Sequence, residues 1–112
     1  MTPVLDFDAL PENRAVCVLV QGEQVALVRT GQGDVYAVGN FDPIGQAMVM
    51  SRGIVGSRAG RDVLVSPLHK QAYDLQTGQC LDADGHRLHV HEVRVVAGTV
   101  HVALAEDHRL TG

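Results

Sequence analysis

Short apolar segments separated by glycine-containing turns constrain the fold of this chain more than any other feature. Valine and other β-formers dominate them, and apolar residues alternate with more polar ones in several. Gln21-Gly22-Glu23, Thr77-Gly78 and Ala97-Gly98 are turn signals between or beside them. The segments cover residues 15–20, 24–30, 34–38, 62–66, 71–75, 92–96 and 99–104. We therefore predict an all-β domain of antiparallel hairpins, preceded by an arm over residues 1–13 with one weak strand or turn.

Length and charge limit the classes of function. A chain of 112 residues corresponds to a single domain over residues 1–112, and 46% hydrophobic residues suit a folded core. The net charge of −4 and the pI of 5.8 argue against binding to nucleic acid. Apolar runs such as residues 15–20 are too short to span a membrane, and residues 1–14 lack the features of a secretory signal. We expect a cytoplasmic protein whose two cysteines are reduced.

One long connection interrupts the hairpins. Residues 39–53 contain Pro43, Gly45 and Gly53, and residues 46–51 could form one or two helical turns. Long connections in small domains are often functional. We therefore expect a functional site in or around this segment.

Residues 63–80 carry a recognisable motif. They resemble the second cluster-binding box of Rieske-type proteins, Cys-Pro-x-His-Gly-x-x-Phe-Asp-x-x-x-Gly. The matching positions are Pro67, His69, Tyr73, Asp74 and Gly78. Ser66 stands in place of the cysteine, and Lys70 in place of a glycine that packs against the cluster.

The preceding strand resembles the one that leads into the first Rieske box, Cys-x-His. Asn40 and Asp42 occupy those two ligand positions. Together with residues 47–56 and 66–71, this pattern resembles the small subunit of bacterial assimilatory NAD(P)H-dependent nitrite reductase, over about residues 4–105. The resemblance implies a Rieske-like (ISP-type) antiparallel β-sandwich with a small inserted tip region at about residues 39–73.

The resemblance also implies a function. In that family a large subunit carries FAD, a 4Fe-4S cluster and siroheme, and reduces nitrite to ammonium with electrons from NAD(P)H. The small subunit would support the large subunit without performing catalysis. The large subunit is therefore the expected partner of this chain.

The residues themselves argue against an iron–sulfur cluster here. A Rieske cluster needs two cysteines and two histidines, whereas Asn40, Asp42, Ser66 and His69 stand at the four ligand positions. Cys17 and Cys80 lie outside both boxes. No Gly-x-Gly-x-x-Gly fingerprint is present, so we do not expect NADH to bind to this chain. We predict no cofactor in this chain and no catalytic residue.

The predicted tip combines positive charge with apolar side chains. Residues 44–73 have a local charge of +3 within a chain of −4. Apolar residues among basic ones suit a docking surface for the large subunit. The candidate docking residues are Phe41, Ile44, Met48, Met50, Arg52, Arg58 and Lys70. A second interpretation is that Phe41 and the methionines fill the space vacated by the cluster, and the two interpretations can coexist.

Three rival interpretations follow from the same residues. The chain could be a cluster-free interaction module for a different redox enzyme or a regulator. It could be a Rieske-type ferredoxin, against which the missing cysteines argue. His86, His89 and His91 form a cluster in the sequence. His89 and His91 could bind zinc or nickel, with His101 as a third ligand, since alternate residues of a strand share a face; the simpler alternative is an exposed polar face.

Overall fold

Antiparallel hairpins make up most of the chain, as the sequence predicts. The structure is a computed structural model, and it describes residues 1–105. Its strands are β1 (Thr2–Asp6), β2 (Arg14–Val20), β3 (Glu23–Arg29), β4 (Val35–Gly39), β5 (Phe41–Asp42), β6 (Ala47–Met48), β7 (Ile54–Arg58), β8 (Arg61–Val65), β9 (Ala72–Asp74), β10 (Val90–Val96) and β11 (Thr99–Ala103). Two short 3₁₀ helices are η1 (Phe7–Ala9) and η2 (Met50–Arg52). The prediction of an all-β fold is confirmed.

Three hairpins share the same two-residue turn. Gln21-Gly22, Ala59-Gly60 and Ala97-Gly98 have positive φ at both positions. Such turns match the right-handed twist of the flanking strands, and glycine adopts positive φ without steric cost. Strand β7, and with it the β7–β8 hairpin, is not among the elements predicted from the sequence, although Ala59-Gly60 carries the same signal as Ala97-Gly98.

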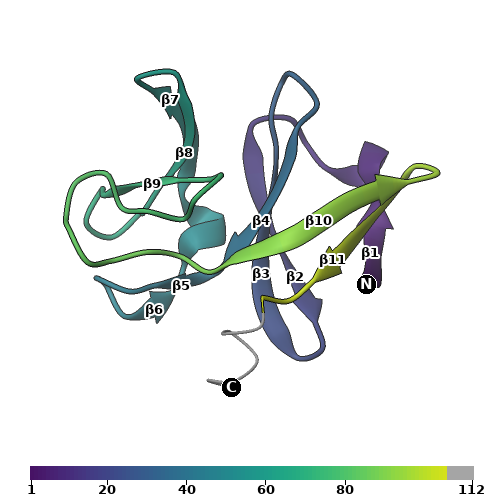
Figure 1. Cartoon of the computed structure of the whole chain (residues 1–112), viewed down its shortest axis with the longest axis horizontal. Coiled ribbons are helices and arrows are strands. Elements are labelled where there is room, and N and C mark those ends of the chain that lie inside the picture. The colour runs from purple at the N-terminus through teal and green to yellow at the C-terminus, as the bar shows by residue number, and fades with distance from the viewer. Residues whose placement is uncertain (106–112) are drawn as a thin grey trace.

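The strands form one large sheet and two smaller ones. The six-stranded sheet has the order β1-β11-β10-β4-β3-β2, and β7-β8-β9 form a three-stranded sheet. The hairpin β5–β6 is a sheet of its own. Figure 1 shows the smaller sheets gathered on one side of the large sheet, with long strand β10 crossing the middle of the molecule. The strands of this smaller part are β5 to β9, which lie between Phe41 and Asp74.

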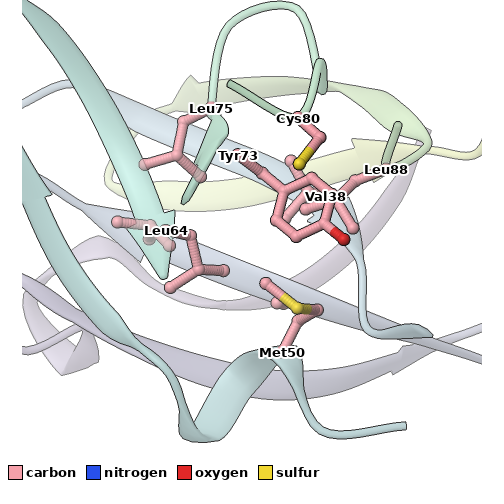
Figure 2. Close-up of a cluster of buried hydrophobic side chains, with 9 residues drawn as sticks. Val38, Met50, Leu64, Tyr73, Leu75, Cys80 and Leu88 are labelled. Carbon is pink, nitrogen blue, oxygen red and sulfur yellow. The ribbon is translucent and has the colours of Figure 1, made fainter. Parts of the chain in front are cut away.

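The core consists of two hydrophobic clusters, and β3 contributes residues to both because it is buried on both faces. Val25 and Leu27 belong to a cluster inside the six-stranded sheet, whereas Ala26 and Val28 belong to a cluster between this sheet and the smaller part. Alternate residues of a strand point to opposite faces, so one strand serves both clusters. Figure 2 shows the second cluster, in which the ring of Tyr73 lies among aliphatic and sulfur-containing side chains.

The connection over residues 39–53 is more ordered than the sequence suggests. It contains the hairpin β5–β6 and the helix η2, so helical structure begins at Met50. Within residues 1–105, no helix is long and apolar enough to cross a membrane.

Candidate functional site

The structure brings the two segments that resemble cluster-binding boxes together. Asp42 lies in β5 and Ser66 directly follows β8, 24 residues later, yet their side chains are hydrogen-bonded. Asn40, Asp42 and Ser66 are all buried, with at most 2% of their surface exposed. His69 is exposed in the loop between β8 and β9. Three of the four predicted positions therefore lie in the interior.

The carboxylate of Asp42 is the centre of a hydrogen-bond network. Its Oδ2 accepts a bond from the Ser66 hydroxyl at 2.5 Å. Its Oδ1 accepts bonds from the Tyr73 hydroxyl at 3.2 Å and from the backbone N–H groups of Ile44 at 2.9 Å and Gly45 at 3.0 Å. This network joins β5, the loop after β8 and β9. We call Asp42, Ser66 and Tyr73 the buried triad.

The donors keep Asp42 ionised despite its burial. Burial by itself raises the pKa of this carboxyl group, but the hydrogen bonds from Ser66, from the two backbone N–H groups and from Tyr73 outweigh it and lower the pKa. Burial and the nearby Asp42 carboxylate raise the pKa of Tyr73, so its hydroxyl keeps the proton that it donates. The buried triad therefore contains one negative charge held by hydrogen bonds.

Asn40 forms a second buried anchor. Its Nδ2 donates to Gln24 Oε1 at 2.8 Å, and its Oδ1 accepts from the Ser51 N–H at 2.7 Å. Its backbone oxygen accepts from the Met50 N–H at 3.0 Å. Asn40 thus ties η2 to β3.

The remaining box residues shape the backbone. Asp74 Oδ1 accepts hydrogen bonds from the N–H groups of Gln76 and Thr77, which closes the turn after β9. Gly78 has φ 80°, and a Cβ there would lie 2.2 Å from the Leu88 backbone oxygen. Lys70 has φ 63°, in the left-handed region that the usual glycine favours. These motif residues therefore stabilise the conformation of the loops instead of binding a cluster.

The donor atoms do not fit a Rieske cluster. Such a cluster is held by two thiolates and two imidazoles, but only His69 of the four positions offers either. Cys80 is buried in the core, and Cys17 on β2 lies 3.8 Å from the Asn40 side chain. Asn40, Asp42 and Ser66 are engaged in hydrogen bonds to the protein. Within the described part of the chain, no three His, Cys, Asp or Glu side chains are grouped to hold a metal ion.

Within the described residues, the histidines do not form the metal site of the rival interpretation. His89 and His91 stack with ring centroids 6.4 Å apart, so they do share a face. His91 is buried, and its Nδ1 accepts a hydrogen bond from the Ala105 N–H at 2.9 Å. His101 is paired with Arg94 on β10, and His86 lies exposed in the 81–89 loop. The structure brings only two of the four imidazoles together.

Exposed apolar side chains lie on the β5–β6 hairpin and beside its turn. Phe41 and Met48 are direct cross-strand partners and are 43% and 42% exposed. Leu68 is 47% exposed, and its side chain lies against Gly45 in the turn of the same hairpin. We call Phe41, Met48 and Leu68 the tip patch. Leu68 is not among the residues predicted from the sequence, because its loop meets this hairpin through tertiary contacts such as the Asp42–Ser66 hydrogen bond.

The other candidate docking residues are dispersed. Met50 is fully buried in the core, so it fits the alternative interpretation of space filling, whereas the exposed Phe41 and Met48 do not. Ile44 is half-buried against the same cluster. Arg58 lies at the turn of the β7–β8 hairpin, which Figure 1 shows on the opposite side of the smaller part from β5 and β6. Arg58, Lys70 and Arg52 are all exposed, and Arg58 pairs with Asp82 at 2.7 Å. The predicted surface is therefore not one continuous patch that includes all seven residues.

Comparison with known proteins places this geometry in a family. Residues 1–103 match the model of the Rieske-like [2Fe-2S] domain. The nitrite reductase (NADH) small subunit of Escherichia coli K12 is 38% identical over 94 residues, which cover 83% of this chain and 86% of the relative. A crystal structure of a candidate NADH-dependent nitrite reductase small subunit from Mycobacterium tuberculosis superimposes with a TM-score of 0.89 at 46% identity, covering 93% of this chain and 94% of that one.

A third relative is a much longer chain. The nitrite reductase [NAD(P)H] large subunit of Klebsiella oxytoca is 34% identical over 99 residues. The match covers 88% of this chain but 10% of the relative. A domain like this one is thus part of a large-subunit polypeptide in that organism.

Proposed function

This chain belongs to the family of Rieske-like [2Fe-2S] domains, among the small subunits of nitrite reductase, and from this membership we propose its function. It is the non-catalytic small subunit of an assimilatory NAD(P)H-dependent nitrite reductase. It supports the reduction of nitrite to ammonium by the large subunit, which carries FAD, a 4Fe-4S cluster and siroheme. The observation that carries this proposal is the 38% identity to the Escherichia coli small subunit over most of both chains.

The partner is the large subunit. The Klebsiella oxytoca relative contains a similar domain within the large-subunit chain itself. Domains that are joined in one organism and separate in another commonly belong to the same assembly. A covalent link makes their association intramolecular without requiring any new contact between them. Free thiols at Cys17 and Cys80 suit a reducing compartment, and we place the complex in the cytoplasm.

This subunit acts without a cluster of its own. Asn40, Asp42 and Ser66 fill the positions of three ligands with groups that bind the protein instead of iron. Electrons therefore pass through the cofactors of the large subunit, and this chain contributes binding and support. The tip patch is the first candidate contact, because its exposed Phe, Met and Leu side chains give it the apolar character of an interface core.

The test is NADH-dependent nitrite reduction by the purified large subunit, with and without this chain. We expect the rate or the lifetime of the activity to rise when the chain is added in equimolar amount. The His69→Ala variant should support the activity as well as the unchanged chain does, because this histidine has no ligand role. A large subunit that neither binds the chain nor responds to it would contradict the proposal and favour a module for a different redox enzyme.

A further inference from the structure

A hollow lies where the edge strands of two sheets approach each other. Strand β2 is the last strand of the six-stranded sheet, and β7 is the first strand of the three-stranded sheet. The hollow has a volume of about 320 Å³ and is lined by residues 13–15 at the start of β2 and by residues 51–55 from η2 and β7. We call it the edge hollow. It lies outside the buried triad.

Strand β7 offers unpaired backbone groups along this edge. It pairs with β8 on one side, and within residues 1–105 its backbone forms no hydrogen bond to any other strand. Alternate residues of an antiparallel strand direct their N–H and C=O groups away from the paired neighbour. An extended peptide can bind to such an edge as an additional strand.

The charge of the edge hollow is one-sided. Arg14 and Arg52 line it and are exposed, and no carboxylate is among its lining residues. Neither arginine forms an ion pair with another residue of the described part of the chain. Glu12, the nearest acid in sequence to Arg14, lies 3.9 Å from Arg29 instead. In a chain of net charge −4, two unpaired guanidinium groups beside an open edge are complementary to a carboxylate.

Asn40 fixes one wall of the edge hollow. Its Oδ1 accepts the Ser51 N–H at 2.7 Å and its backbone oxygen accepts the Met50 N–H at 3.0 Å. Both bonds hold η2, which presents Ser51 and Arg52 to the hollow. A position that holds a ligand in true Rieske proteins therefore positions a surface residue here. The wall is formed before any partner arrives, which reduces the entropic cost of binding.

We propose that the edge hollow binds an extended acidic segment of the large subunit, which adds to β7 as a further strand and places a carboxylate against Arg14 and Arg52. This inference rests on the proposed function and adds a second contact to the tip patch. A free inorganic anion would leave the β7 edge unpaired. It would also leave uncovered the side chain of Ile54, which lies at the start of β7 and is 65% exposed. A peptide segment can pair with the β7 edge, neutralise Arg14 and Arg52, and cover Ile54.

The test compares two double charge reversals in the full chain, titrated against the intact large subunit. Arg14→Glu with Arg52→Glu should raise the dissociation constant at least tenfold, and more at low salt than at high salt. Arg87→Glu with Arg94→Glu is the matched control, because it changes the net charge equally at exposed residues outside the hollow. The dissociation constant of this control should stay within about threefold of the wild-type value, since scattered surface charges contribute little to binding. Unfolding curves of all variants check that the domain remains folded.

Hydrogen exchange supplies an independent measurement. Peptides that cover residues 54–58 should gain protection in the complex with the large subunit, and this gain should disappear in the Arg14→Glu, Arg52→Glu variant. Equal affinity of that variant and the wild type, or no added protection at β7, would overturn the inference while leaving the proposed function intact. Tight binding of free nitrite or phosphate to the isolated chain, abolished by the same reversal, would also overturn it. A wild-type chain that fails to bind the large subunit would instead refute the proposed function.

Discussion

Removing the carboxylate of Asp42 tests whether the buried triad holds the tip region together. In Asp42→Ala, four donors lose their acceptor: the hydroxyls of Ser66 and Tyr73 and the N–H groups of Ile44 and Gly45. The two hydroxyls belong to residues with no exposed surface, so water cannot replace the carboxylate there without opening the structure. The two backbone groups belong to half-buried residues and can be rehydrated.

The magnitude follows from the two buried hydroxyls. An unsatisfied buried donor costs about 1–3 kcal/mol, so we expect Asp42→Ala to lower the free energy of unfolding by about 2–6 kcal/mol. A domain of this length has a stability of about 6–17 kcal/mol, and each kcal/mol shifts the melting temperature by about 4 °C. Ser66→Ala should cost about 1.5–3 kcal/mol, because one hydrogen bond to a charged group is lost. In the double variant the second substitution should cost much less, since its partner is already absent.

The assay is urea unfolding of the four proteins in the double-mutant cycle, followed by circular dichroism. Asp84→Ala is the control, since Asp84 is exposed and forms no ion pair within the described residues. Its free energy of unfolding should stay within about 0.5 kcal/mol of the wild type. An Asp42→Ala variant as stable as this control, or a cycle with strictly additive costs, would refute the role given to the buried triad.

Four further predictions follow from the same structure. Because the pKa of Asp42 is lowered in the folded state, its contribution to stability is present above about pH 3.9, the unfolded value, and is lost as the pH falls through the folded value; Asp42→Asn should flatten the acid side of a stability–pH curve, and an unchanged curve would contradict this. Purified protein should contain neither iron nor acid-labile sulfide, and stoichiometric amounts of both in a colorimetric assay would disprove the cluster-free interpretation. Phe41→Ser with Met48→Ser should weaken binding to the large subunit at least tenfold, whereas Leu19→Ser, at a residue 68% exposed on β2, should not; equal affinities would remove the tip patch from the interface. Leu64→Ala should lower the free energy of unfolding by about 2–5 kcal/mol in chemical denaturation, because Leu64 is fully buried beside Tyr73, and a loss below about 1 kcal/mol would count against this packing.

Local chemistry made much of the fold predictable from sequence. Strand periodicity and turn residues are properties of neighbouring positions, so β2, β3, β4, β8, β10 and β11 were predicted close to their observed bounds. The sequence likewise shows that Asn40, Asp42 and Ser66 replace cluster ligands. The short strands β5 and β6 were not predicted, because two residues carry no periodicity.

The sequence by itself therefore determined that the chain is an all-β domain of Rieske type without the cluster-ligand set. Only the tertiary structure decided what replaces those ligands and which side chains reach the surface. The Asp42–Ser66 contact, the burial of Met50, the exposure of Leu68 beside Gly45 and the meeting of Arg14 with Arg52 at one hollow all join segments far apart in the chain. Contacts between segments far apart in the chain depend on how the sheets pack against one another. That packing is set by the whole core rather than by any local pattern.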